Sequence, residues 1–338
     1  MITISLCMIV KNEERVLARC LDTVADLVEE IIIVDTGSTD RTKEIATRYT
    51  DKIYDFQWID DFSAARNFAF SKATKEYIYS ADADEVLSPE NRELFKVLKE
   101  SLLPEIEIVQ MKYGNLLENG TVYNFDEEHR PKLFKRLREF VWESPIHEMV
   151  RLHTTVYDSD IVITHMPETN HAGRDLAVFR KHIAQGWQPP KRLHSVYARE
   201  LFLSGSEEDF AKAIGFFTES AADINRSADE VTESCLVVAR ACRLAKDVVG
   251  FFKYASKVIA GEGCSEICCE MGQFYEEQQD YEEAAIWYYN AVYETEPVLV
   301  KASGDVEGLQ GLIRCYQALG LEDVAKEYEE ELTKVCQE

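Results

Sequence analysis

Two carboxylates at a short interval are the first residues in the sequence that suggest chemistry. Asp82 and Asp84 are separated by a single alanine and follow the apolar segment 77–80. Alternate residues of an extended segment point to the same side, so both carboxylates can face one cation. Hard divalent ions such as Mg²⁺ and Mn²⁺ prefer oxygen ligands and are often shared with substrate phosphates. The pattern therefore favours metal-assisted chemistry on a phosphorylated substrate.

Other phosphate-binding signatures are absent from the sequence. It contains neither G-x-G-x-x-G nor G-x-x-x-x-G-K-[ST], so the dinucleotide-binding and P-loop classes lose their main support. A D-x-D pair alone is weak evidence, because two acids after a strand are ordinary in an acidic protein. Asp35 strengthens the metal interpretation, since it ends a second apolar segment, 30–35, just before a Gly-Ser-Thr-Asp turn.

These acids need strands to position them. The first half alternates strands, expected at 2–10, 30–35, 52–56 and 77–80, with helices, expected at 16–21, 41–49 and 61–70. Such alternation indicates an α/β domain with a mainly parallel, Rossmann-like sheet. Ligands of these sheets bind beyond the carboxyl ends of the strands, so the active site is expected at that edge.

Four ordered motifs in this half carry a family resemblance. Segments 4–13, 34–42, 61–67 and 82–84 resemble the GT-A glycosyltransferases of family 2, which move a sugar from a nucleotide diphosphate sugar with inversion at the anomeric carbon. The resemblance implies a GT-A fold, a nucleotide-sugar donor, expected to be a UDP-hexose, and Mn²⁺ or Mg²⁺ as cofactor.

The resemblance also assigns residues. The ends of the first two strands are implied to hold the base and the ribose, at Val10, Lys11, Asn12, Glu13 and Asp35. Arg66 and Asn67 match the segment that lines the nucleotide and sugar pocket. Asp82 and Asp84 match the metal motif.

Two later segments resemble one bacterial branch of the family. Segments 131–135 and 142–148 are similar to those of a branch with a C-terminal helical-repeat domain, which includes the S-glycosyltransferases of sublancin-type bacteriocins. Lys132 stands where this branch usually has arginine, and lysine cannot make the planar two-pronged contact of a guanidinium. Arg130, two residues earlier, is the candidate to replace that contact.

The catalytic assignments rest on the same segment. His147 is expected to be a further metal ligand or a donor to the diphosphate, and Glu148 is the candidate base for the acceptor. A purely structural His-Glu pair is the alternative. The next candidates for the base are Asp126, Glu127, Glu128 and Glu143. For His165 and His171, a role in substrate binding and a role in packing both stay open.

The second half carries a different pattern. Gly272, Tyr275, Ala284, Tyr288 and Ala291 fall at the spacing of a tetratricopeptide repeat, in which small residues let helices approach and aromatics fill the space between them. We expect about four antiparallel helix pairs. The chain is therefore expected to consist of a GT-A nucleotide-sugar-binding domain at 1–185 and an all-α tetratricopeptide-like repeat domain at 190–338.

Composition limits the partners. The 338 residues include 37 Lys+Arg and 62 Asp+Glu, which gives a net charge of −25 and argues against nucleic acid and anionic lipid as partners. Without an apolar run of about 20 residues or a signal-like N-terminus, no transmembrane segment is expected. An odd number of cysteines, nine, is typical of reduced thiols and a cytoplasmic protein.

Two classes of function remain open at this point. The first is a metal-dependent inverting glycosyltransferase whose acceptor is a peptide Cys, Ser or Thr presented by the repeats, or else a cell-surface or capsule glycan. The second is a decayed GT-A scaffold for a repeat-mediated binding role. The joint presence of Asp82, Asp84, His147 and Glu148 favours the enzyme. The repeats also offer a surface for a homodimer.

Overall fold

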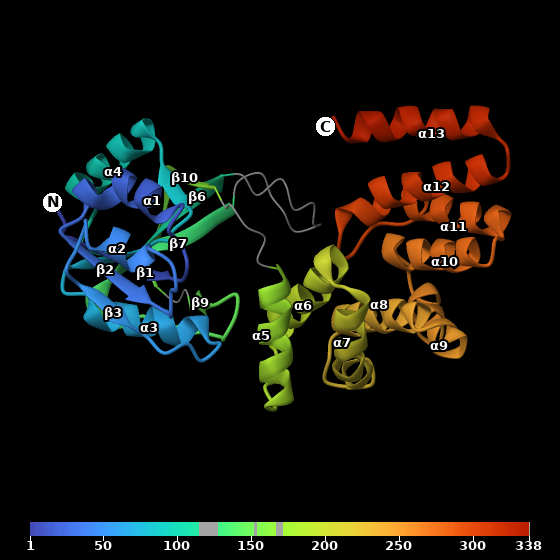
Figure 1. Cartoon of the computed structure of the whole chain (residues 1–338), viewed down its shortest axis with the longest axis horizontal. Coiled ribbons are helices and arrows are strands. Elements are labelled where there is room, and N and C mark those ends of the chain that lie inside the picture. The colour runs from blue at the N-terminus through green and yellow to red at the C-terminus, as the bar shows by residue number, and fades with distance from the viewer. Residues whose placement is uncertain (115–127, 152–153, 167–171, 338) are drawn as a thin grey trace. The chain divides into compact units, whose positions relative to one another are not determined.

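The computed structural model describes residues 1–114, 128–151, 154–166 and 172–337. Its contacts divide the chain into two compact units, and the described residues of the second unit are 172–337. Figure 1 shows the strands in the blue and green part of the chain and only helices in the yellow to red part.

The first unit contains an eight-stranded sheet in the order β3-β2-β1-β4-β7-β6-β10-β5. Its strands are β1 (Ile4–Val10), β2 (Glu30–Asp35), β3 (Ile53–Asp55), β4 (Tyr77–Ser80), β5 (Glu85–Leu87), β6 (Ile108–Gly114), β7 (Glu128–Lys135) and β10 (Val156–His165). A small ribbon is formed by β8 (Trp142–Glu143) and β9 (Met149–Val150). The four strands predicted from the sequence are confirmed as β1 to β4.

Helices cover both faces of this sheet, which explains the apolar strands. Alternate residues of β1 pack with residues of α1 (Leu17–Val24), α2 (Thr42–Ala46) and α4 (Pro89–Ser101). On the other face, residues of β2 and β4 pack with those of α3 (Phe62–Lys72). Because both faces are buried, β2 has no exposed residue. The predicted α/β architecture with a mainly parallel sheet is confirmed.

Strand directions bring several polar strand ends to one edge. β1, β2, β3 and β4 are mutually parallel, β7 is antiparallel to both β4 and β6, and β10 runs parallel to β6. β5 is antiparallel to β10, with Glu85 opposite His165. The carboxyl ends of β1, β2, β4 and β10 and the amino ends of β5 and β7 therefore share an edge.

The second unit contains the nine helices α5–α13 in its described residues. They are α5 (Ala172–Ala184), α6 (Lys191–Ser204), α7 (Glu207–Ser220), α8 (Ala228–Leu244), α9 (Val248–Ile259), α10 (Ser265–Glu277), α11 (Tyr281–Tyr293), α12 (Val306–Ala318) and α13 (Glu322–Val335). The predicted helix pairs correspond to α6–α7, α8–α9, α10–α11 and α12–α13. A Cβ added at Gly272 would lie 2.8 Å from the ring of Tyr288, so this position needs a glycine, as the repeat pattern requires.

Helix α5 groups with the repeats rather than with the first domain, to which the predicted boundary at 185 assigns it. Leu176 and Phe179 are fully buried, and the Phe179 ring stacks on that of Tyr197 of α6 with 4.7 Å between centroids. The apolar face of α5 thus packs against helices, and the sequence pattern of one helix did not reveal that partner.

No helix in the described part of the chain combines the length and apolar character needed to cross a membrane. All nine cysteines are free, eight of them buried and Cys336 exposed.

Candidate functional site

The loops after β1 and β2 are tied together at the shared edge. Asn12 lies in the left-handed region with φ 58°, its N–H donates to Ser38 Oγ at 2.9 Å, and its Oδ1 accepts from Thr39 N–H at 2.8 Å. The Glu13 N–H donates to Thr42 Oγ1 at 2.7 Å. The backbone around the exposed Lys11 is therefore held in one conformation, as a binding loop requires.

Asp35 occupies the buried end of β2. Its Oδ2 accepts from the N–H groups of Gly37 and Ser38 at 3.1 and 3.0 Å, and the Val10 carbonyl accepts from Thr36 N–H at 2.9 Å. Its Oδ1 is buried and has no hydrogen-bond partner within the described residues. A buried acceptor without a donor is costly, so this atom marks a place for a ligand N–H.

Arg66 of α3 lies at the centre of a second group of charges. Its Nε donates to Glu148 Oε1 at 2.5 Å, its Nη2 to Asp82 Oδ1 at 2.8 Å, and its Nη1 to Ser80 Oγ at 3.2 Å. The guanidinium also lies 5.0 Å from the ring centroid of Trp142. One arginine thus joins two of the predicted catalytic and metal-binding carboxylates.

These charges hold one another ionised. Burial alone would raise the pKa of Asp82, but Arg66 and Lys132 outweigh it and keep this pKa well below its usual range. Burial would likewise lower the pKa of Arg66, and Asp82 and Glu148 raise it instead. Asp82 therefore stays ionised although desolvation opposes its charge.

Asp84 pairs with a histidine that sequence reasoning left open. His165 Nε2 lies 3.0 Å from Asp84 Oδ2, and this hydrogen bond, opposed by burial, raises the pKa of His165. His165 ends β10, which is three strands from β4 in the sheet. No sequence pattern indicated a partner for His165, because pairing of distant strands cannot be read from local pattern.

Lys132 is buried behind this pair instead of facing the edge. Its Nζ forms an ion pair with Glu85 Oε1 at 2.5 Å, and the Tyr113 hydroxyl donates to the same oxygen at 3.0 Å. Burial raises the pKa of Glu85. Arg130 pairs with Glu128, and its guanidinium lies 4.0 Å from the Tyr113 ring centroid. Glu85 was missed by the sequence reasoning, although it directly follows the D-x-D pair.

Asn67 has a fixed position. Its Nδ2 donates to the Trp142 carbonyl at 2.9 Å and its Oδ1 accepts from the Trp142 N–H at 2.8 Å. Both ends of the amide therefore hold β8 against α3. Nucleotide or sugar contact by Asn67 stays a prediction, and this clamp is a role that the sequence did not indicate.

The predicted metal set of Asp82, Asp84 and His147 does not form a cluster. Among the residues described, no three His, Cys, Asp or Glu side chains are grouped so that they could hold a metal ion. The physical reason is that Asp82 turns to Arg66 while Asp84 turns to His165. His147 has a left-handed backbone with φ 44°. Asp126, Glu127 and His171 lie outside the described residues.

Comparisons with known proteins concern mainly the first unit. Residues 5–156 match the family model described as glycosyl transferase family 2. The chain is 39% identical over 151 residues to a TPR repeat-containing protein of Synechococcus elongatus, covering 44% of this chain and 36% of that protein. It is 32% identical over 148 residues to the SPbeta prophage-derived glycosyltransferase SunS of Bacillus subtilis, covering 43% of this chain and 34% of SunS.

The chain therefore spans about a third of the length of these curated relatives. One similar solved structure is glucosyl-3-phosphoglycerate synthase from Mycobacterium tuberculosis in complex with Mg²⁺ and uridine diphosphate. The sequence identity is 16% and the TM-score 0.40, over 56% of this chain and 81% of the synthase.

Proposed function

We propose that this chain moves a hexose from a nucleoside diphosphate sugar to a polypeptide. The premise of the proposal is that residues 5–156 form a family 2 glycosyltransferase domain. The observation that carries the proposal is one sheet edge with two carboxylates. Asp35, which has an open acceptor, ends β2, and Asp84, which has an imidazole partner, lies between β4 and β5 of the same sheet.

The donor assignment rests on Asp35. Its Oδ1 is a buried acceptor without a partner in the described chain, so it suits a base that presents a ring N–H. Uracil and guanine both carry such a group, whereas adenine and cytosine do not when neutral. A UDP-sugar is proposed as the donor, with Val10, Lys11, Asn12 and Glu13 forming the loop beside the nucleoside.

The residues present fit a divalent cation. Mg²⁺ and Mn²⁺ are commonly bound by one or two protein groups while substrate phosphates and water supply the remaining ligands. The oxygen of Asp84 and the nitrogen of His165 form such a two-residue set, with Asp82 nearby on Arg66. A bound cation would neutralise the charge on the departing diphosphate.

Glu148 is proposed as the base. Its Oε1 is held by Arg66, and its side chain is 10% exposed. The thiol sulfur or hydroxyl oxygen of the acceptor attacks the anomeric carbon, whose bond to the diphosphate oxygen breaks with inversion. The acceptor proton passes to Glu148, and the nucleoside diphosphate leaves. A cysteine acceptor needs less from the base, because thiols ionise nearer to neutral pH.

The test is a panel of UDP- and GDP-sugars measured with the full chain in Mn²⁺, by thermal shift and by hydrolysis without acceptor. We expect one UDP-sugar to stabilise the protein and to be hydrolysed slowly. Asp84→Asn should remove both the activity and its dependence on Mn²⁺, while Asp160→Asn, an exposed control, should not. Full activity in EDTA would exclude the metal.

The base has its own test. Glu148→Gln should lower turnover by about 10²–10⁴-fold and leave donor affinity unchanged, because proton transfer is lost but the nucleotide contacts remain. Glu93→Gln is the matched control, since Glu93 is an exposed glutamate of α4 paired with Lys96 and has no proposed role in the site. If the chain neither binds nor hydrolyses any donor, the scaffold alternative is correct.

A further inference from the structure

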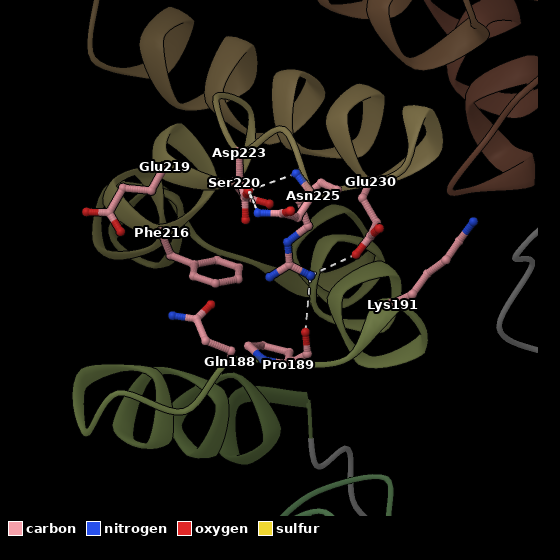
Figure 2. A pocket seen from close by; sticks show the side chains of 10 residues that line it. Gln188, Pro189, Lys191, Phe216, Glu219, Ser220, Asp223, Asn225 and Glu230 are labelled. Carbon is pink, nitrogen blue, oxygen red and sulfur yellow. Dashed lines mark hydrogen bonds and ion pairs between the residues drawn. The ribbon is translucent and has the colours of Figure 1, made fainter.

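A cavity of about 570 Å³ lies in the second unit, remote in sequence from every residue assigned above. It is lined by the segment before α6, by the end of α7 and by the loop that leads into α8, and includes Gln188, Phe216, Glu219, Asp223 and Arg226 (Figure 2). This volume is within the range of ligand pockets, about 300–1,000 Å³. The cavity is large enough to take one or two side chains of a partner.

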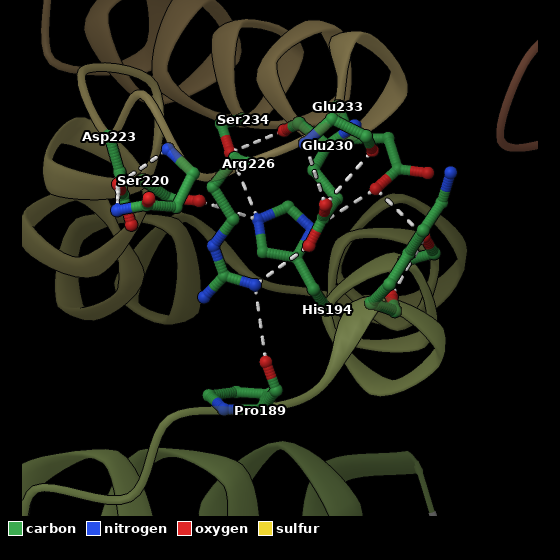
Figure 3. Close-up of polar contacts among 12 residues, drawn as sticks. Pro189, His194, Ser220, Asp223, Arg226, Glu230, Glu233 and Ser234 are labelled. Carbon is green, nitrogen blue, oxygen red and sulfur yellow. Dashed lines mark hydrogen bonds and ion pairs between the residues drawn. The ribbon is translucent and has the colours of Figure 1, made fainter.

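A buried polar network forms its floor. His194 of α6 is fully buried, and its Nε2 lies 2.8 Å from Ser220 Oγ and 3.0 Å from Ser234 Oγ (Figure 3). Its Nδ1 lies 3.1 Å from Glu233 Oε2. Because Ser220 also lines the cavity, the network joins α6, α7 and α8 directly beneath it. A satisfied network of this kind rigidifies its surroundings, so the cavity is preformed.

The basic side chains of the cavity are already compensated. Arg226, 12% exposed, donates from Nη1 to Glu230 Oε1 at 2.7 Å and to the Pro189 carbonyl at 3.1 Å. Lys191 pairs with Asp229 at 2.7 Å. These pairs leave no surplus positive charge at the cavity.

Two of the three acidic side chains that line the cavity have no ion-pair partner in the described chain, and the third, Glu230, is bound by Arg226. Within the described chain, neither Glu219 nor Asp223 forms an ion pair, and both are exposed. The Asn225 N–H and side-chain amide donate to Asp223 and lower its pKa, so this carboxylate stays charged. The rim of the cavity therefore carries a net negative charge.

The remaining wall is aromatic. Phe216 contributes its ring to the cavity, between the two acids and Gln188 in Figure 2. An aromatic face beside carboxylates attracts an ammonium or guanidinium group, through both the ring quadrupole and the charges. Residues 191–338 hold 14 basic and 29 acidic residues, so a cationic segment would also be steered toward this unit.

We propose that this cavity binds a lysine or arginine side chain of the acceptor polypeptide, against Phe216 and between Glu219 and Asp223. The inference rests on the proposed function only in naming the bound polypeptide as the acceptor. It assigns the selection of the acceptor to the repeat unit, through a basic residue near the modified one.

The test compares two fluorescein-labelled peptides of equal length, Gly-Ser repeats that contain either two lysines or two glutamines. Binding to the full chain is measured by fluorescence anisotropy in low and in physiological salt. We expect the lysine peptide to bind, and its binding to weaken as the salt concentration rises. The glutamine peptide should bind at least about fivefold more weakly than the lysine peptide. Equal binding of the two peptides, or no binding of the lysine peptide, would overturn the inference.

Three variants locate the binding. Glu219→Lys should weaken binding of the lysine peptide by about fivefold or more, and Asp223→Asn should weaken it by about threefold. Glu262→Lys is the control, because Glu262 is exposed outside the cavity and the substitution changes net charge by the same amount. If Glu262→Lys weakens binding as much as Glu219→Lys, the peptide is held by general charge and not by this cavity.

Hydrolysis of the UDP-sugar is measured in parallel and separates the two proposals. Glu219→Lys should hydrolyse the donor at the rate of the unchanged chain, because the residue is in the other unit. Absent hydrolysis with selective lysine-peptide binding would contradict the glycosyltransferase proposal alone. Normal hydrolysis with peptide binding that ignores Glu219 would contradict the cavity alone.

Discussion

At the residue scale, Arg66 is the side chain on which the charge state of the site depends. It is 13% exposed and binds Asp82 and Glu148 at the same time. Buried carboxylates persist in the charged form only when they are paired and hydrogen-bonded. Arg66 thus keeps Asp82 ionised and restricts the orientation of both Asp82 and Glu148, which a base and a cation-binding group both need.

Two substitutions of Arg66 should distinguish the effect of its charge from the effect of its directed hydrogen bonds. Arg66→Met leaves both carboxylates without their partner, so we expect the free energy of unfolding to fall by about 3 kcal/mol in urea titrations. Arg66→Lys keeps the charge but cannot make three directed contacts, and should cost less stability while still lowering turnover. Arg48→Lys, an exposed control just after α2, should change neither. Equal stability of the Met and Lys variants would contradict this role.

Sequence reasoning reached the members of this site but not their pairing. Asp82, Glu148 and Arg66 were all predicted, since each belongs to a motif that local pattern makes visible. The contacts Arg66–Glu148 and Asp84–His165 join residues 82 and 81 positions apart. Such partners are selected by the order of strands in the sheet, which no local pattern specifies. For the same reason His147 was assigned to the metal set and His165 was left open.

At the element scale, Glu30 fastens the start of β2 to its surroundings. Its Oε1 accepts from Lys52 Nζ at 2.5 Å and from Thr74 Oγ1 at 2.9 Å. Its Oε2 accepts from the Thr74 N–H at 2.8 Å and from the hydroxyl of Ser5 of β1. Burial opposes ionisation, but these donors lower the pKa of Glu30 to about 2. One side chain thereby joins β1, β2 and the segment after α3.

The stabilisation from Glu30 should depend on pH with a defined sign. Its folded pKa of about 2 is below the usual 4.5, so its contribution is complete above pH about 4.5 and is lost as pH falls toward 2. Glu30→Gln should therefore lower the free energy of unfolding by about 2–3 kcal/mol at pH 7, and the difference from the unchanged chain should shrink below pH 4.5. Glu44→Gln on the surface of α2 is the control. A difference that does not vary with pH would contradict the assignment.

At the scale of the whole molecule, the two units differ in how they bury their apolar residues. The first has its apolar residues on the two faces of a sheet, and the second has them between helices. The repeat pattern predicted the helix pairs well, because small and aromatic residues recur at fixed intervals. It did not place α5, which has no partner helix of its own in the repeat pattern and packs on α6 instead. Compact units of this size usually unfold as cooperative blocks of their own.

Two unfolding transitions are therefore expected for the full chain, and ligand and mutation should act on them separately. A UDP-sugar with Mn²⁺ binds only the first unit in our proposal, so at a hundred times its Kd it should stabilise that transition by about 2.7 kcal/mol and leave the other unchanged. His194→Leu removes the partner of Glu233, Ser220 and Ser234, so it should lower only the second transition, by about 2–4 kcal/mol. Ser204→Ala, an exposed control at the end of α6, should shift neither transition. Calorimetry with and without donor measures both effects. A single transition whose temperature is raised by the donor and lowered by His194→Leu would show that the two units unfold as one.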